Sequence, residues 1–122
     1  MSVNKTNPQW RAQTQLVRGG THRSQFAETN EAIFMTSGYV YETAEQAQRA
    51  FKGEEERFIY SRFSNPTVGM FEERMRLLEG ATSCQATATG MAAVWGALAA
   101  RLKAGNRLVA SRALFGSCHV VC

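Results

Sequence analysis

The sequence lacks the long apolar runs and the strongly basic stretches that mark membrane and nucleic-acid-binding proteins. No apolar run approaches the roughly 20 residues that a membrane-spanning helix needs, and the polar start of the chain has no apolar core of a secretory signal. The net charge is +4, and the 14 Lys and Arg residues are interspersed with acidic ones. We therefore expect no membrane and no nucleic-acid partner.

Cysteine and histidine are scarce as well. The three cysteines, Cys84, Cys118 and Cys122, are odd in number and form no C-x-x-C pair, which argues against a disulfide framework and against a zinc site. The two histidines, His22 and His119, fit no metal or Ser/His/Asp arrangement, so we expect structural roles for them. We expect reduced thiols in a cytoplasmic protein without a metal, with Cys84 in the core.

The chain has enough apolar character for a folded domain. Its hydrophobic fraction of 44% and charged fraction of 20% are ordinary for a soluble globular protein, and 122 residues suffice for a core. Residues 1–30 show no clear periodicity and are broken by the pair Gly19-Gly20, so we expect residues 1–15 to form a loose arm. We therefore expect the regular helices and strands after residue 30.

Two helices are predicted from their end signals. Thr43 followed by Gln46 has the spacing of a capping box, and it predicts a helix over residues 44–51. A second helix is predicted to run to residue 79, capped by Asn65 or Thr67 and ended by Gly80.

Beyond that point the pattern alternates. Small residues at 84–88 predict a strand, residues 91–102 predict a helix, and residues 108–110 predict a second strand before a loop-to-helix passage at Phe115. This alternation predicts an α/β fold with a parallel sheet. Two parallel strands cannot cover both of their own faces, so we expect the chain to be the front portion of a larger α/β protein.

Three segments offer the chemistry of a binding site. Tyr60 and Arg62 lie two apart, so in an extended segment their hydroxyl and guanidinium would face one anionic target; a surface Arg beside a half-buried Tyr is the alternative. Thr89-Gly90-Met91 joins a predicted strand to a helix, and bare N–H groups at such a helix start suit an anion; an ordinary tight turn is the alternative.

The third segment begins at Phe115, after the second predicted strand. An aromatic ring at the carboxyl end of a strand can stack on a planar ligand, although a core Phe is the alternative. The turn at Thr89 matches neither the G-x-x-x-x-G-K-[ST] nor the G-x-G-x-x-G pattern, which argues against ATP and NAD. An anion nest, an Arg–Tyr pair and an aromatic platform together suit a flat cofactor with a phosphate, and pyridoxal phosphate is the candidate.

Four motifs occur in order: Y-x-R-x-x-N-P-T from Tyr60, L-E-G-A from Leu78, A-T-G-M-A-A from Ala88 and L-K-A-G-N from Leu102. This set resembles the Cys/Met-metabolism family of pyridoxal-phosphate enzymes, over a span from about Thr14 to the end of the chain. Within the family, F-M-T-S-G-Y-V-Y from Phe34 and F-G-S-C from Phe115 most resemble the sulfhydrylases of O-succinylhomoserine.

The resemblance implies a fold-type I transferase. Residues 1–62 would form an extended N-terminal arm with a small helical segment, and residues 63–122 would begin the large α/β domain, with its parallel or mixed sheet, that binds the cofactor. The resemblance also implies a homo-oligomer, a dimer with shared sites within a tetramer.

The resemblance assigns cofactor-binding roles to individual positions. Tyr60 and Arg62 would bind the phosphate of the neighbouring subunit's cofactor, and Gly90 and Met91 would donate backbone N–H groups to the phosphate of their own subunit's cofactor. Thr89 stands where the family more often has Ser, and it keeps the hydroxyl. Phe115 stands where the family's lyases usually carry a Tyr that stacks on the pyridine ring; stacking is kept, the phenol is lost, and this argues against a lyase.

The family's Schiff-base lysine, pyridine-pairing Asp and substrate-binding Arg lie later than this chain reaches. Lys5, Lys52 and Lys103 occupy an arm, a helix end and a turn, so we expect no catalytic residue among residues 1–122 and no activity from them alone. The implied activity of a longer chain is γ-replacement on O-succinylhomoserine, in which succinate leaves and sulfide adds to give homocysteine for methionine biosynthesis. Cystathionine γ-synthase and γ-lyase activities, and a truncated piece that acts only in assembly, are the alternatives.

Overall fold

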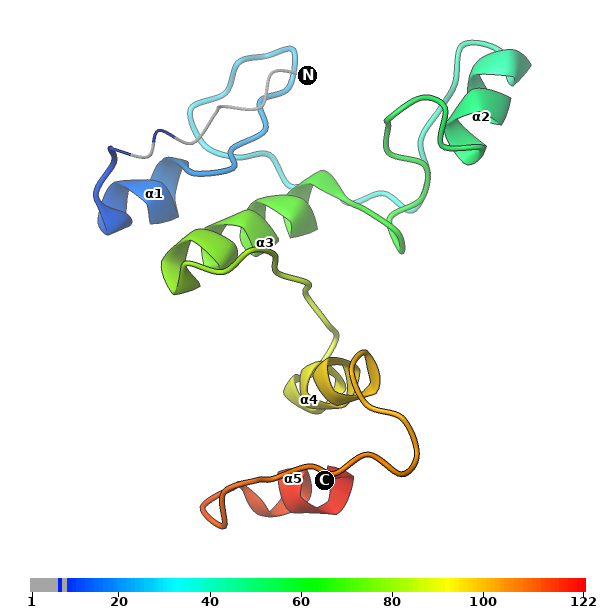
Figure 1. Cartoon of the computed structure of the whole chain (residues 1–122). Helices are drawn as coiled ribbons and strands as arrows, with labels where there is room; N and C mark the ends of the chain where they lie inside the picture. Colours follow the sequence, from blue (N-terminus) through cyan, green and yellow to red (C-terminus); the bar gives the residue numbers. More distant parts are fainter. Residues whose placement is uncertain (1–6, 8) are drawn as a thin grey trace. The chain divides into compact units, whose positions relative to one another are not determined.

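The computed structural model describes Asn7 and residues 9–122, and this part of the chain contains five helices and no β-strand. The chain forms two compact units, Met1–Cys84 and Gln85–Cys122, and each is treated by itself. The first unit holds α1 (Ala12–Arg18), α2 (Ala44–Phe51) and α3 (Pro66–Glu79), and the second holds α4 (Gly90–Ala99) and α5 (Gly116–Val121) (Figure 1). The domain boundary at residue 62 stays a prediction.

Helix α2 has the bounds that its sequence predicts. The Thr43 hydroxyl oxygen accepts a hydrogen bond from the backbone N–H of Gln46 at 3.1 Å. The Gln46 side chain reaches back to the N–H of Glu42 at 2.9 Å, one residue before the usual partner in a capping box. The polar groups at the start of this short helix are thus satisfied locally, which confirms the predicted start.

Helix α3 is the longest helix, and both of its predicted ends are confirmed. Asn65 is the N-cap, because its side-chain oxygen accepts from the N–H of Thr67 at 2.8 Å, and Pro66 follows in the first turn. Gly80 ends the helix in the left-handed conformation, with φ of 61°. Met70, only 2% exposed, is the largest apolar side chain buried in the first unit.

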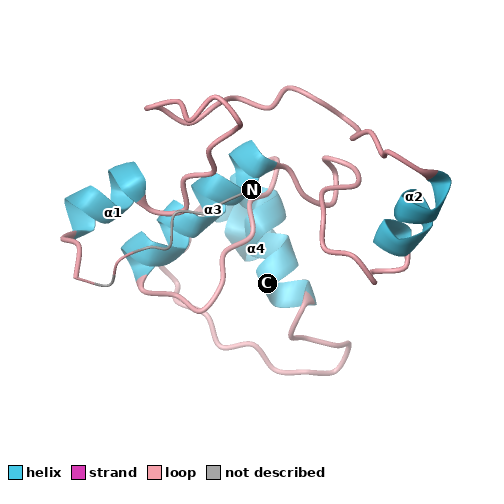
Figure 2. Ribbon diagram, turned by 90° about the horizontal axis from the view of Figure 1, so that it is seen from above, coloured by secondary structure: helices cyan, strands magenta, loops and turns pink. Residues whose placement is uncertain are grey.

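The prediction of a loose arm up to residue 15 is wrong where it overlaps α1. This seven-residue helix has neither a capping side chain nor a buried residue, so the sequence carries little signal for it. It forms because it packs along α3, and Figures 1 and 2 show the two helices side by side.

Arg74 of α3 forms hydrogen bonds to the carboxyl end of α1. Its guanidinium donates to the backbone oxygens of Val17 at 3.2 Å and Gly19 at 3.4 Å, both at the carboxyl end of that helix. The same guanidinium forms an ion pair with Glu31. A cation at a helix C-terminus satisfies carbonyl groups that have no partner within the helix, so Arg74 stabilises α1 from outside.

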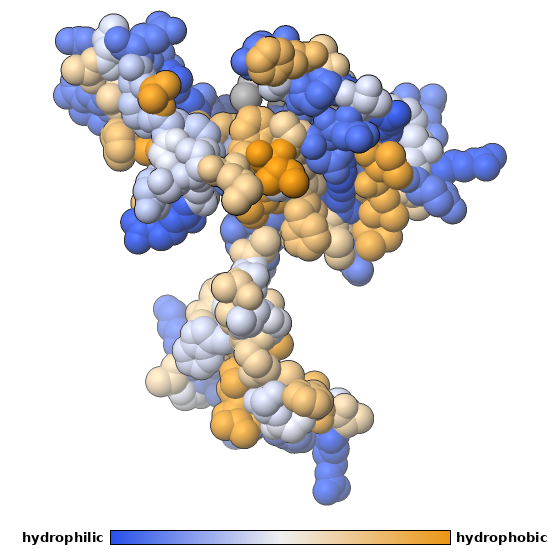
Figure 3. Space-filling model, turned by 180° about the vertical axis from the view of Figure 1, so that it is seen from behind, coloured by the Kyte–Doolittle hydropathy of each residue, from blue (hydrophilic) through white to orange (hydrophobic). Residues whose placement is uncertain are grey.

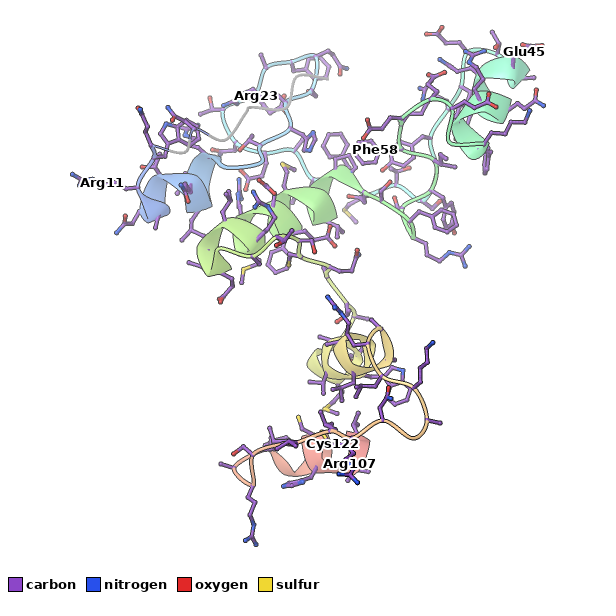
Figure 4. The ribbon with its side chains drawn as sticks, in the orientation of Figure 1. Arg11, Arg23, Glu45, Phe58, Arg107 and Cys122 are labelled. Carbon is purple, nitrogen blue, oxygen red and sulfur yellow. The ribbon has the colours of Figure 1, made fainter. Side chains whose placement is uncertain are left out.

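A small aromatic cluster fixes the stretch before α3. The Phe58 ring, labelled in Figure 4, stacks on Tyr39 with centroids 5.5 Å apart and meets His22 edge-on at 6.4 Å. The backbone N–H of His22 donates to the sulfur of Met70 at 3.3 Å. His22 therefore has a packing role, as expected from sequence.

The two predicted strands are absent from the described residues. Residues 84–88 and 108–110 belong to no β-ladder, and the described part of the chain has one isolated bridge, between Gly38 and Tyr60. A strand exists only with a partner, and the small residues that suggest a strand provide none. The helix predicted over residues 91–102 forms as α4 but ends at Ala99. Cys84, predicted to be a core residue, is only partly buried.

Much apolar surface remains exposed in both units. Helix α4 has no buried residue although it is apolar on all sides, and Trp95 on it is 61% exposed. Met35 and Val40 in the first unit are 94% and 90% exposed. Figure 3 shows orange, apolar atoms on the surfaces of both units. Apolar helices of this kind are normally buried, so these surfaces are suited to further contacts.

Candidate functional site

The segment from Tyr60 to Arg62 is a turn, and its predicted extended geometry is wrong. The backbone N–H groups of Phe63 and Ser64 both donate to the Tyr60 oxygen, at 2.9 and 3.2 Å. Two consecutive bonds to one carbonyl close a turn and abolish the alternation on which the prediction rests. Pro66 restricts Asn65 to an extended conformation, but it has no such effect three residues earlier.

The turn nevertheless brings the Tyr60 and Arg62 side chains together. The guanidinium carbon of Arg62 lies 5.6 Å from the centre of the Tyr60 ring and 5.1 Å from that of Phe63. Arg62 is exposed and pairs with no carboxylate among the described residues. Two aromatic rings thus lie near the guanidinium, and its N–H groups have no carboxylate partner among the described residues and could bind an anion.

Asn65 joins this turn to an earlier segment. Its side-chain nitrogen donates to the Ser61 hydroxyl oxygen and to the backbone oxygen of Phe34, each at 3.0 Å. Thr67 adds a neighbouring link, because its hydroxyl accepts from the N–H of Phe34 at 2.9 Å. Asn65 is 8% exposed, and these bonds are partly buried.

Residues 36–38 hold the other side of the turn. The Ser61 N–H donates to the backbone oxygen of Ser37 at 2.9 Å, and the Ser61 hydroxyl donates to that of Thr36. Gly38 forms the isolated antiparallel bridge with Tyr60. The residue between Tyr60 and Arg62 is therefore held by both its backbone and its side chain.

The second predicted half of the site lies at the start of α4. Thr89 is the N-cap, and its hydroxyl accepts from the N–H of Ala92 at 3.1 Å, which confirms the predicted helix start. The N–H groups of Gly90 and Met91 have no hydrogen-bond acceptor among the described residues. A Cβ atom on Gly90 would meet nothing within 4 Å, so there is open space beside this helix end.

Phe115 lies at the start of α5 and is 78% exposed, so it belongs to no core formed by the described residues. Helix α5 lies against α4 through the sulfur of Met91, which accepts from the Ser117 hydroxyl at 3.5 Å and lies 4.0 Å from the Cys118 sulfur. The Met91 side chain therefore links the start of α4 to the segment that carries Phe115.

The predicted residues fall into two groups. Tyr60 and Arg62 belong to the first unit, and Thr89, Gly90, Met91 and Phe115 belong to the second. Sequence reasoning recognised Asn65 only as a helix cap and overlooked Ser61 and Phe63. The position of Asn65, three residues after Arg62 in the Y-x-R-x-x-N-P-T motif, is the sequence signal for a role in the turn. A polar side chain so close to a turn can hydrogen-bond to it and orient it.

None of the helices in the described part of the chain combines the length and the apolar character of a membrane span. The same part contains no group of three or more His, Cys, Asp or Glu residues placed to hold a metal ion.

Comparison with known proteins places the chain in a family. Residues 13–122 match the family model described as Cys/Met metabolism PLP-dependent enzyme. The chain belongs to this Cys/Met metabolism family. Membership supports an α/β fold in general, and the cofactor of the family is pyridoxal 5'-phosphate (PLP).

Several members of the Cys/Met metabolism family are similar to the chain over most of its length. An O-succinylhomoserine sulfhydrylase of Mycobacterium tuberculosis is 60% identical over 106 residues, which cover 87% of this chain and 26% of that protein. An O-succinylhomoserine sulfhydrylase of Pseudomonas aeruginosa is 44% identical, and an L-methionine gamma-lyase of Porphyromonas gingivalis is 36% identical; 85% and 84% of this chain are covered, with 26% of each relative. The chain thus spans about a quarter of the length of these relatives.

Proposed function

We propose that the full-length protein with this sequence binds PLP through Tyr60, Arg62, Thr89, Gly90, Met91 and Phe115. The cofactor carries a phosphate dianion and a flat pyridine ring, so a fitting site needs N–H and O–H donors for the former and an apolar face for the latter. The donors and rings at these six positions meet both needs.

The start of α4 supports the phosphate assignment in the second unit. Two backbone N–H groups, those of Gly90 and Met91, lack acceptors among the described residues and lie at the positive end of a ten-residue helix. Gly90 leaves the space for a phosphate to approach, and Thr89 retains an O–H donor after it has capped the helix.

The turn of Tyr60 and Arg62 supports the second contact. An unpaired guanidinium near two aromatic rings can provide two parallel N–H donors for phosphate oxygens, and the Tyr60 hydroxyl can provide a third donor. We propose that this turn serves the cofactor of a neighbouring subunit, so that each site is shared within a homo-oligomer.

Phe115 is the proposed partner of the pyridine ring. Its side chain is exposed at the start of a helix that Met91 ties to α4, so it belongs to the unit that provides Gly90. A phenyl ring stacks on a flat ligand without donating or accepting a proton, so its role is restricted to binding and orientation.

The proposed reaction is γ-replacement on O-succinylhomoserine: the bond between Cγ and the ester oxygen breaks, succinate leaves, and sulfide forms the new C–S bond of homocysteine. The observation that supports it is the 60% identity over 87% of the chain with a protein of that name. PLP, when bound, withdraws electrons from the carbon skeleton of an amino acid. We place the protein in methionine biosynthesis in the cytoplasm, and its catalytic lysine beyond residue 122.

Steady-state assays of the full-length protein test this activity. We expect homocysteine to form from O-succinylhomoserine and sulfide with a kcat/KM well above that for cysteine as the nucleophile. Faster turnover with cysteine would instead indicate cystathionine γ-synthase activity. Release of methanethiol from methionine alone, faster than the sulfide reaction, would indicate a γ-lyase.

The phosphate assignment has a test of its own. Arg62→Ala in the full-length protein removes charge-assisted hydrogen bonds, and we expect PLP affinity to fall by about 3 kcal/mol, roughly a hundredfold. Titration of the apoprotein with PLP, followed by absorbance, measures this. Arg101→Ala, at an exposed position outside the proposed site, is the matched control, and equal affinities for wild type and Arg62→Ala would rule the assignment out.

A further inference from the structure

We propose that Asn65 is a positioning residue for the phosphate-binding pair Tyr60 and Arg62, in addition to capping α3. The inference rests on the proposed function, because it concerns how that pair is held. Its basis is one juxtaposition: a buried amide that bonds to Ser61, between Tyr60 and Arg62, and to Phe34, 31 residues earlier in the chain.

Every part of the Asn65 amide has a partner. The oxygen accepts from the N–H of Thr67 at 2.8 Å and so caps α3. The nitrogen uses its two N–H groups for the Ser61 hydroxyl and the Phe34 backbone oxygen, each at 3.0 Å. A helix cap needs only the oxygen, so the two donor bonds require another explanation.

The donor bonds act on the turn through Ser61. The Ser61 hydroxyl accepts from Asn65 and donates its own proton to the backbone oxygen of Thr36. Ser61 is thus fixed between the start of α3 and residues 36–37, and its two neighbours in the chain are Tyr60 and Arg62. A turn held in this way keeps both side chains on one target without reordering when the phosphate binds.

Asn65→Asp separates the two roles. Aspartate keeps the acceptor for the Thr67 N–H and caps helices well, but it has no N–H groups for Ser61 and Phe34. The carboxylate would also compete with Thr36 for the Ser61 proton. The cap therefore survives while the link to the turn is lost.

The measured quantity is the phosphate discrimination of the full-length apoprotein, defined as the Kd of pyridoxal divided by the Kd of PLP. These ligands differ only in the phosphate, so effects on ring binding and on the general fold cancel. We expect Asn65→Asp to lower this ratio by about tenfold in the wild-type background, because a partly buried hydrogen-bond network is broken. In a background of Tyr60→Phe with Arg62→Ala, we expect less than a twofold effect, because the groups that Asn65 positions are absent.

Three results would overturn the inference. An equal loss of discrimination in both backgrounds would show that Asn65 acts independently of the pair. An unchanged ratio with a lowered Tm would show a purely structural role. If Tyr60→Phe with Arg62→Ala itself leaves the ratio at its wild-type value, the proposed phosphate site is wrong and the inference fails with it.

A second variant covers the case in which Asn65→Asp does not fold. Ser61→Ala leaves the α3 cap untouched and removes the Asn65 link to the turn, and it should lower the ratio in the wild-type background only. Thr43→Ala is the matched control, because it removes the N-cap of α2 in the same unit and contacts no residue of the turn. It should lower Tm without a change in phosphate discrimination.

Discussion

Gly20 shows how one missing side chain allows α1 to lie against α3. Its φ is +66°, a left-handed value that favours glycine, and a Cβ atom there would lie 2.6 Å from Cγ and 2.8 Å from Cβ of Glu73. A Cβ atom on the neighbouring Gly19 would be equally close to α3, at 2.6 Å from a methyl carbon of Leu77. The sequence alone indicates only a break at this pair, because a glycine does not specify which backbone segment approaches it.

Substitution of Gly20 by alanine should therefore combine two costs. We expect Gly20→Ala to lower the free energy of unfolding of the full-length protein by about 3 kcal/mol, through strained φ and overpacking against Glu73. Gly80→Ala is the matched control, since Gly80 has a φ of +61° with nothing within 4 Å of its Cβ position, and should cost about 1 kcal/mol. Urea unfolding measures both, and equal costs would contradict the close approach.

Glu31 makes the attachment of α1 sensitive to acid. The hydrogen bond and charge of Arg74 lower the pKa of Glu31 from 4.5 to about 2. A carboxylate whose pKa is lower in the folded state contributes stability above its unfolded pKa and loses it as the pH falls through the folded value. The relevant window is therefore about pH 4.5 down to about 2.

Replacement of Glu31 by glutamine tests this window. Because the Glu31 side chain is 39% exposed, we expect Glu31→Gln to cost only about 1 kcal/mol at pH 7. The difference from wild type should shrink as the pH falls from 4.5 toward 2, as measured by amide exchange in α1. Glu54→Gln, at an exposed position with no ion pair among the described residues, should show no such trend.

At the scale of helices and strands, prediction succeeded where the signal is local. Helices α2 and α3 have caps and glycine stops that a sequence displays directly, and both were placed correctly. Helix α1 depends on packing against α3 and on Arg74, which no local pattern contains. The strands expected at 84–88 and 108–110 need partner strands, which a local sequence pattern does not reveal. The turn at Tyr60 is held by residues 34–38, which are also distant in the sequence, so its geometry could not be predicted from the neighbouring residues.

Helix α4 should depend on the Thr89 hydroxyl. We expect Thr89→Ala to destabilise its first turn by about 1 kcal/mol, because the Ala92 N–H loses its acceptor, while Thr89→Ser keeps the oxygen and should behave like wild type. Amide exchange of a peptide covering residues 90–99 in the full-length protein measures the difference. Thr82→Ala is the control, since Thr82 makes no hydrogen bond among the described residues; faster exchange in this control would show an effect unrelated to capping.

For the molecule as a whole, exposed apolar surface is the dominant property of the part of the chain that the structure describes. Each unit leaves large apolar side chains in water, including Phe71 at 54% and Trp95 at 61%. Few apolar side chains of the described part are buried, namely Ala50, Pro66 and Met70. A core of that size cannot offset the conformational entropy lost on folding.

Residues 1–122 expressed alone should therefore fold poorly. We expect strong binding of the dye ANS, a broad thermal transition and no homocysteine production, whereas the full-length protein should melt cooperatively and bind little dye. A sharp two-state transition of the monomeric 122-residue chain would contradict this, because it would require a core that the described residues lack.

The amide of Asn65 also bears on the order in which the protein folds. Its bond to Phe34 spans 31 residues, so the intervening chain must close into a loop, at an entropic cost, before the bond can form. The caps of α2 and α3 reach only two or three residues and need no such closure. During refolding, helical circular dichroism should therefore rise before the protein becomes able to discriminate PLP from pyridoxal.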